Sequence, residues 1–212
     1  MNYIISCEDL FGIEGAAAED PWAIEIRLDL LDGCTPDDLI MIRRTWKGRL
    51  LLTLRSTDEG GKFAGDSTEW RNRLAPLLPY ADMIDIEERF SAHADWIRSE
   101  KKTIIASYHA KRMLGSEDLF TCERRLRSFG DIPKIVLAPE SDEDAAALLQ
   151  FLVHAEKPIC LSIMGDSYSW LRPIFLIMGS HCAYCHAGDA TATGQFHIRE
   201  MREIHNLLMR TG

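Results

Sequence analysis

The chain contains the run Gly130-Asp131-Ile132-Pro133-Lys134-Ile135-Val136-Leu137-Ala138-Pro139, in which a lysine interrupts an otherwise apolar segment. Ile, Val and Leu between two prolines are typical of a short strand that is buried on both faces of a parallel sheet. A buried ammonium is costly unless it is paired or loses its proton, so we expect the pKa of Lys134 to fall toward neutrality. A lysine that is neutral near pH 7 can attack a ketone and form a Schiff base.

Taken alone, Lys134 has a second interpretation. A lysine at the end of a strand can extend its ammonium to solvent and bury only its methylene groups. The choice between the two depends on which other polar residues occupy comparable positions along the chain.

Composition limits the class of protein. With 212 residues and 46% hydrophobic content, the chain has enough material for one globular domain with a sizeable core. The net charge of −9 and the absence of a basic stripe argue against nucleic acid as a partner. No apolar run approaches the roughly 20 residues needed to cross a bilayer, and Met1–Cys7 indicates a first strand instead of a signal peptide. We therefore expect a cytoplasmic protein that does not enter the membrane.

Two of the cysteines belong to a motif that is found at haem attachment sites. Six cysteines in a cytoplasmic chain are most simply reduced thiols, but Cys182-Ala183-Tyr184-Cys185-His186 matches the C-x-x-C-H pattern of haem attachment. Covalent haem normally accompanies export, and a structural zinc site usually draws on two separated ligand pairs. The neighbouring residues favour a late strand, so we expect neither a metal nor an organic cofactor.

Strand and helix patterns alternate along the whole chain. Helix starts are indicated at Thr35-Pro36, Ser116 and Ser141, where acidic residues follow a capping residue. An amphipathic pattern follows Phe196, whereas the connection Gly12–Asp20 is short for a full helix. The predicted strands cover residues 2–7, 23–28, 49–54, 81–86, 103–108, 133–138, 158–163 and 180–185.

This alternation predicts an α/β fold, a (β/α)8 TIM barrel formed by a single domain over residues 1–212. The length lies at the short end of the range for that fold. A doubly wound open sheet is the alternative, but no glycine-rich phosphate loop follows an early strand.

Polar residues recur at the ends of the predicted strands, where a barrel carries its catalytic groups. Because alternate residues of a strand share one side, the carboxylates and arginine of the second strand can face the interior together. The residues are Glu25, Arg27 and Asp29 of the second strand, Arg55 and Glu59 after the third, Asp82, Asp85 and Glu87 of the fourth, His109 of the fifth, Lys134 of the sixth and Met164 after the seventh.

Each of these residues also has a purely structural interpretation. Glu25 and Arg27 can form a buried ion pair, His109 can be a hydrogen-bonded core histidine, and Arg55 can pair with Glu59 to order a loop. Their comparable positions in successive strands favour a single converging site instead.

Several short motifs follow one another in a characteristic order. They are Glu25-Ile26-Arg27-Leu28-Asp29, Thr53-Leu54-Arg55 with Glu59-Gly60-Gly61, Asp82-Met83-Ile84-Asp85-Ile86-Glu87, Ser107-Tyr108-His109, Pro133-Lys134, Met164 with Arg172 eight residues later, Gly179-Ser180 and Gly194-Gln195. In this order they resemble the type I 3-dehydroquinate dehydratases of the shikimate pathway, over nearly the whole chain. Each motif is weak alone, but the set is specific.

The chain departs from that family at three places. Leu171 stands where a serine usually precedes the late arginine, and Tyr168 stands at a position that is often glycine. The closing loop, commonly S-x-P-G-Q, is Thr191-Ala192-Thr193-Gly194-Gln195. Thr191 keeps a hydroxyl donor, while the missing proline at Thr193 should leave the loop less preorganised.

The resemblance implies a lyase that converts 3-dehydroquinate to 3-dehydroshikimate. Lys134 would form an imine with the substrate ketone, His109 would act as general base and general acid, and Glu59 would orient His109. Arg172 would pair with the substrate carboxylate. The remaining expected contacts to substrate, or to other groups of the site, come from Glu25, Arg27, Arg55, Met164, Thr191 and Gln195.

Two other functions remain open from the sequence. One is another imine-forming barrel, such as an aldolase of small sugar phosphates, although no late glycine-rich phosphate loop is evident. The other is a non-catalytic barrel that binds a metabolite, which the altered closing loop suggests and the joint presence of Lys134, His109, Glu59 and Arg172 opposes. Barrels of the family often pair through outer helices, so we expect a homodimer.

Overall fold

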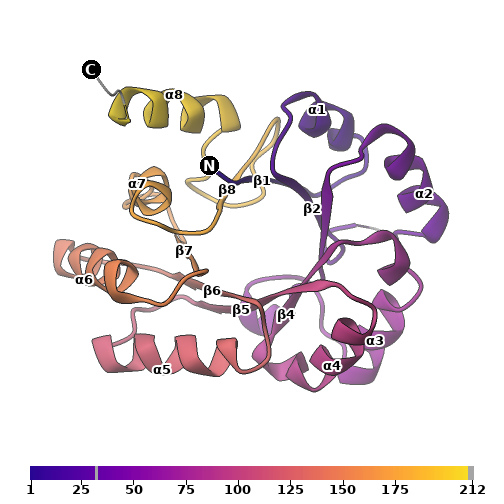
Figure 1. Cartoon of the computed structure of the whole chain (residues 1–212), viewed down its shortest axis with the longest axis horizontal. Helices are drawn as coiled ribbons and strands as arrows, with labels where there is room; N and C mark the ends of the chain where they lie inside the picture. The colour runs from indigo at the N-terminus through magenta and orange to yellow at the C-terminus, as the bar shows by residue number, and fades with distance from the viewer. Residues whose placement is uncertain (32, 210–212) are drawn as a thin grey trace.

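Eight parallel strands form one curved sheet in the computed structural model, which describes residues 1–31 and 33–209 (Figure 1). Each strand lies within two or three residues of its predicted position. The strands are β1 (Tyr3–Cys7), β2 (Ala23–Arg27), β3 (Arg49–Thr53), β4 (Met83–Glu87), β5 (Thr103–Ala110), β6 (Ile132–Leu137), β7 (Cys160–Ile163) and β8 (Ala183–Cys185).

The sheet is a nearly closed barrel. Its backbone ladder runs without interruption from β8 through β1 to β7. At the seam between β7 and β8, the backbone N–H of His181 donates to the carbonyl of Ile159 at 2.6 Å. The predicted (β/α)8 TIM barrel is therefore confirmed.

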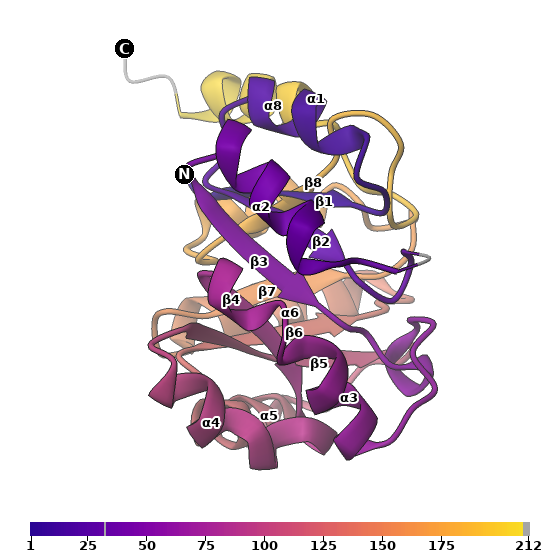
Figure 2. The same ribbon diagram turned by 90° about the vertical axis from the view of Figure 1, so that its right-hand side faces the viewer.

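A helix follows each strand and covers the outside of the barrel (Figures 1 and 2). Thr35 and Ser141 cap their helices as predicted, whereas the third predicted start has Gly115 as its N-cap and Ser116 as its first residue. The short first connection holds a seven-residue helix. The helices are α1 (Gly12–Ala18), α2 (Pro36–Thr45), α3 (Ser67–Leu74), α4 (Ala94–Ser99), α5 (Ser116–Arg127), α6 (Asp142–His154), α7 (Leu171–Ile177) and α8 (Ile198–Leu208). None of these described helices is long and apolar enough to cross a membrane.

Alternate residues of each strand divide the core into two parts. Outward-facing residues such as Ile24 and Leu52 pack in a large cluster with the helices. Inward-facing apolar residues form a second, smaller cluster inside the barrel. That inner cluster contains Ile4, Ala23, Leu51, Met83, Ile105, Ile132, Cys160, Cys182 and Tyr184. It fills the barrel on the amino-terminal side of the polar inward-facing residues.

The C-x-x-C-H segment contributes to strand β8, as its neighbours predicted. Cys182 belongs to the inner cluster and Cys185 to the outer one, so the two thiols lie on opposite sides of the sheet. The six cysteines are free thiols, and the described residues contain no group of His, Cys, Asp and Glu side chains arranged to hold a metal ion.

Candidate active site

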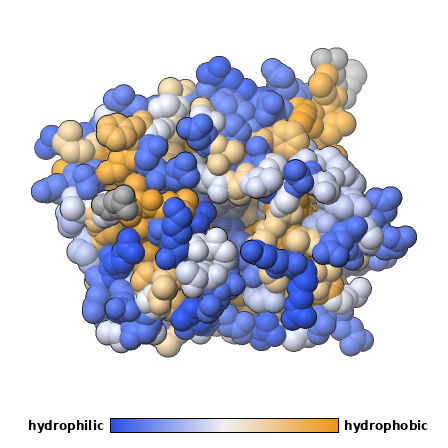
Figure 3. Space-filling model, turned by 180° about the vertical axis from the view of Figure 1, so that it is seen from behind, coloured by the Kyte–Doolittle hydropathy of each residue, from blue (hydrophilic) through white to orange (hydrophobic). Residues whose placement is uncertain are grey.

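A cavity of about 450 Å³ opens at the carboxyl ends of the strands. Figure 3 views the molecule from the side toward which these ends point, and the surface there is hollowed near its centre between mostly hydrophilic residues. The residues to which the family resemblance assigned a catalytic or binding role all line the cavity: Glu25, Arg27, Arg55, Glu59, His109, Lys134, Met164, Arg172, Thr191 and Gln195.

Lys134 lies inside the barrel and does not reach solvent. Its residue is 5% exposed, which rules out the interpretation of a lysine extended to water. The ammonium Nζ donates to Asp85 Oδ2 at 3.2 Å and lies 4.0 Å from the centre of the Tyr184 ring. Of the two ways to accommodate a buried ammonium, the structure shows pairing with a carboxylate and an aromatic face.

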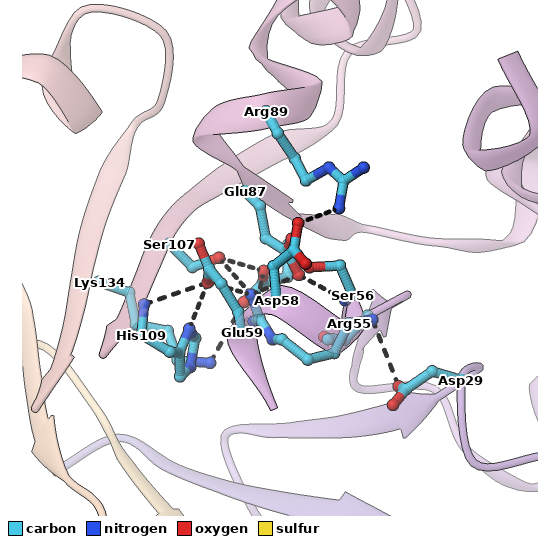
Figure 4. Close-up of polar contacts among 12 residues, drawn as sticks. Asp29, Arg55, Ser56, Asp58, Glu59, Glu87, Arg89, Ser107, His109 and Lys134 are labelled. Carbon is cyan, nitrogen blue, oxygen red and sulfur yellow. Dashed lines mark hydrogen bonds and ion pairs between the residues drawn. The ribbon is translucent and has the colours of Figure 1, made fainter. Parts of the chain in front are cut away.

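Arg55 connects the charged residues of neighbouring strands (Figure 4). Its guanidinium donates to Asp85 Oδ1 at 2.8 Å, and to Glu87 Oε1 and Glu59 Oε2 at 3.0 Å each. It also donates to Ser107 Oγ at 2.9 Å. The pairing of Arg55 with Glu59 predicted for a loop is present, but it is one branch of a buried network that fixes Asp85 beside Lys134.

The turn after β3 brings Glu59 back over the site. Gly61 allows this turn, because a Cβ at that position would lie 2.2 Å from the carbonyl oxygen of Arg55. Gly60 has a φ of 85°, which glycine adopts at little cost. The two glycines of the Glu-Gly-Gly motif are thus required by the local backbone geometry, and the turn that they form places Glu59 beside His109.

Glu59 holds both the backbone and the side chain of His109. Glu59 Oε2 lies 2.8 Å from His109 Nδ1 and accepts the backbone N–H of His109 at 3.1 Å. His109 is therefore not an isolated core histidine, since its ring lines the cavity and is fixed by a carboxylate. Such a contact at Nδ1 leaves Nε2 as the ring atom that can exchange a proton with a ligand.

Burial shifts the proton affinities of this pair in opposite directions. It raises the pKa of Glu59 to about 8, and the Arg55 cation offsets the shift only in part. Burial, followed by the positive charges of Arg55, Lys134 and Arg27, holds the pKa of His109 well below 6.5. His109 is consequently neutral at pH 7, the form in which an imidazole can accept a proton.

Glu25 and Arg27 both face the interior but do not pair with each other. Glu25 accepts hydrogen bonds from Ser6 Oγ at 2.5 Å and Thr53 Oγ1 at 2.6 Å. Arg27 instead forms a two-pronged ion pair with Asp29, at 2.9 and 2.8 Å. The alternative prediction of a buried ion pair between Glu25 and Arg27 is therefore wrong, because Arg27 pairs with Asp29. Both Glu25 and Arg27 line the cavity.

Arg172 differs from the other arginines of the cavity. Its Nη1 donates to Ser162 Oγ at 3.2 Å and its Nη2 to the carbonyl of Thr193 at 3.3 Å. No carboxylate among the described residues pairs with it, and its buried Nε has no acceptor there. Burial lowers the pKa of this guanidinium to about 10, so it remains a cation at pH 7. A buried cation with an unused donor fits an anionic ligand group.

The loop Thr191–Gln195 lies against the turn that follows β7. Gly194 has a φ of 72°, and a Cβ there would come within 2.5 Å of the carbonyl oxygen of Gly165. The Gln195 amide accepts from the Thr191 backbone at 3.1 Å and from its hydroxyl at 3.2 Å, and donates to the carbonyl of Cys185 at 3.1 Å. In this arrangement Thr191 and Gln195 secure the loop over the cavity.

One acidic residue that was expected at the site lies elsewhere, and other residues of the site were not assigned a role from the sequence. Asp82 precedes β4 and pairs with Arg43 on the outside, so it does not belong to the site. Asp85, the carboxylate partner of Lys134, was noted from the sequence among the acids of the fourth strand, without a role. Tyr184 and Ser162 were not predicted to belong to the site. Each stands in a short segment in which no pattern marks it as a site residue.

Known proteins resemble this chain over its full length. The type I 3-dehydroquinase family model matches residues 7–211. A 3-dehydroquinate dehydratase of Methanoregula boonei is 36% identical over 208 residues, which is 98% of this chain and 100% of the relative. One of Methanospirillum hungatei is 39% identical over 186 residues, 88% of this chain and 73% of the relative. The crystal structure of the 3-dehydroquinate dehydratase from Aquifex aeolicus superposes with a TM-score of 0.86 at 25% identity and full coverage of both chains.

Proposed function

The chain belongs to the type I 3-dehydroquinase family, and from that premise we propose that it dehydrates 3-dehydroquinate to 3-dehydroshikimate through an imine on Lys134. One observation carries the proposal: a buried lysine, a neutral histidine held by the Glu59 side chain and an arginine without a carboxylate partner all line one cavity. Each of these groups suits a different part of the same substrate.

The first step is covalent. Lys134 Nζ, after giving up a proton, adds to the C3 ketone, and loss of water yields a protonated imine. Asp85, 3.2 Å from Nζ, is placed to hold the nitrogen through this change. The positive imine then withdraws electrons from C2 and makes its hydrogen acidic.

His109 moves the proton. Its neutral ring removes the C2 hydrogen and then, as a general acid, protonates the C1 hydroxyl as it departs as water. Glu59, 2.8 Å from Nδ1, orients the ring. Hydrolysis of the conjugated imine releases the product and regenerates the amine of Lys134.

Arg172 binds the substrate carboxylate in this scheme. Its unused Nε–H and its Nη groups offer the planar donor fork that matches a carboxylate. Met164 contributes an apolar contact for the ring. Glu25, Arg27, Arg55, Thr191 and Gln195 either bind substrate hydroxyls or hold the groups that do.

Turnover tests the proposal directly. Wild-type protein mixed with 3-dehydroquinate should generate the ultraviolet absorbance of a conjugated enone, and Lys134→Ala should abolish it. Lys47→Ala, which removes an exposed lysine of the connection between α2 and β3, is the matched control and should keep full activity. Activity of Lys134→Ala near the wild-type rate would rule out the imine mechanism.

We also propose that the enzyme is a homodimer. Leu207, Leu208 and Met209 at the end of the last helix are more than half exposed, an apolar surface suited to a second copy. Sedimentation at micromolar protein concentration should give the mass of two chains, whereas the mass of one chain would contradict this.

A further inference from the structure

Tyr184 lies directly beside the nitrogen of Lys134. The tyrosine is on the inward side of β8, and its ring centre is 4.0 Å from Lys134 Nζ. Both residues are at least nine-tenths buried, so little water competes for the ammonium. An aromatic face at this distance attracts a cation through the negative charge above and below its ring.

We propose that Tyr184 is a positioning residue whose aromatic face stabilises the positive charge at the Lys134 nitrogen, first as the ammonium and then as the protonated imine. The inference rests on the proposed imine mechanism. In this proposal β8, in addition to β5 and β6, contributes a side chain that helps to activate the substrate as an electrophile.

Imine formation changes what can hold this nitrogen. An ammonium has three N–H donors, whereas a protonated imine has one. Imine formation therefore removes two of the three hydrogen bonds that the nitrogen can donate. Asp85 can accept that single N–H. The attraction to an aromatic face does not depend on a particular N–H, and it therefore persists when the lysine becomes an imine. The ring keeps the imine protonated, the form that draws electrons from C2.

The ring, and not the hydroxyl, has this role. The buried hydroxyl of Tyr184 has no hydrogen-bond partner among the described residues. Phenylalanine would retain the aromatic face, while leucine would keep an apolar side chain without it. Comparison of Tyr184→Phe with Tyr184→Leu therefore isolates the contribution of the ring.

The pH profile must be interpreted with the groups that surround Lys134. Asp85 is its direct partner, and Tyr184 is the neighbour under test. The other titratable or charged groups that face this part of the interior are Glu25 of β2, Arg55 of β3, His109 of β5, Cys160 of β7 and Cys182 before β8. None of them is altered in either variant, so a difference between the two variants reports the ring.

The experiment measures kcat from pH 6 to pH 10 and the rate at which borohydride traps the enzyme with 3-dehydroquinate at pH 8.5. A desolvated cation held by an aromatic ring is favoured on the order of 10-fold to 30-fold. In Tyr184→Leu we expect the alkaline decline of kcat to move to lower pH and the rate of trapping to fall by about that factor. Tyr184→Phe should match wild type in both measurements.

The outcomes separate the two proposals. Failure of wild-type enzyme to trap substrate would remove the imine mechanism itself. Normal trapping by wild type together with a wild-type pH profile for Tyr184→Leu, or with equal losses in the Leu and Phe variants, would overturn the role of the ring alone. If Tyr184→Leu does not fold by circular dichroism, phenylalanines with increasing ring fluorination at this position provide the same test. The decline of kcat should then move stepwise with fluorination, and an unchanged decline would contradict the proposal.

Discussion

In the proposed mechanism His109 can accept a proton because its surroundings keep it neutral. Burial and three neighbouring cations hold its pKa well below 6.5, while Glu59 fixes its Nδ1. Neutral imidazole is thus available throughout the physiological range, and the acid decline of kcat/KM should lie below pH 6.5.

Replacement of His109 should separate imine formation from proton transfer. His109→Ala still has Lys134 and Asp85 in place, so substrate should still be trapped by borohydride. Turnover should fall by about 10²–10⁴, the usual effect of losing a general acid–base group. A variant that no longer traps substrate would show that His109 acts in imine formation as well.

The raised pKa of Glu59 predicts how the stability of the protein depends on pH. Its pKa is raised from 4.5 to about 8 on folding, so between these values the folded protein retains a proton that the unfolded chain has lost. Its contribution to the free energy of unfolding therefore falls as pH rises through this window and is constant above it. Urea unfolding at pH 5 and pH 8.5 should show that Glu59→Gln gains stability relative to wild type at the higher pH. An equal difference at both values would mean that Glu59 is already ionised at pH 5.

Individual residues show where sequence reasoning succeeds and where it stops. Lys134 and His109 were identifiable because polar residues recur at comparable positions of successive strands and because the motifs that contain them follow a characteristic order. The partner of Lys134 was not, since the stagger of the strands around the barrel decides whether Asp85, Glu87 or Glu25 comes within reach. The aromatic contact of Tyr184 likewise joins two strands, β8 and β6, whose contacting residues are 50 positions apart in the sequence.

At the scale of elements, the closing loop Thr191–Gln195 is the clearest departure from the family pattern. The structure places this loop over the cavity, where Gly194 contacts the turn at Gly165 and the Thr193 carbonyl accepts from Arg172. The carbonyl contact does not need a side chain, so proline at position 193 leaves it intact. The path of the loop depends on Gly194, because a Cβ there would collide with the neighbouring turn.

Proline at this position should favour the arrangement described. Thr193→Pro restricts the open forms of the loop and should stabilise the closed one by about 0.4–1 kcal/mol. Steady-state kinetics should show a lower KM, with kcat unchanged, or reduced if opening limits product release. A higher KM in a variant that is folded by circular dichroism would show that residue 193 adopts a backbone conformation that proline does not tolerate.

At the scale of the whole molecule, the strand–helix period was sufficient to predict the barrel. Eight apolar runs at regular spacing, with capped helices between them, allow few other arrangements. The first connection, described from the sequence as short for a full helix, holds the seven-residue helix α1. The Gly115 cap of α5 was not predicted, because the neighbouring Ser116 is a more common capping residue. The interior division into an apolar layer and a polar layer was only partly visible, since residues such as Cys160 and Cys182 carry no clear sign of facing inward.

The barrel also explains why so many charges can be buried together. Arg55 after β3, Asp85 and Glu87 of β4 and Lys134 of β6 meet in one network of ion pairs, so most charges in the interior are compensated by a neighbour. Arg172 has no carboxylate partner among the described residues, and it lines the cavity. An acidic chain of net charge −9 thus presents a cationic group at the one place where an anionic substrate would enter.

The proposed mechanism requires that Lys134 form a covalent imine with 3-dehydroquinate. Wild-type enzyme should be mixed with this substrate, reduced with borohydride, digested and analysed by mass spectrometry. We predict a stable adduct on the peptide that contains Lys134, and no adduct in Lys134→Ala or when substrate is omitted. Full turnover with no adduct on Lys134, or an adduct on a different lysine, would contradict the account.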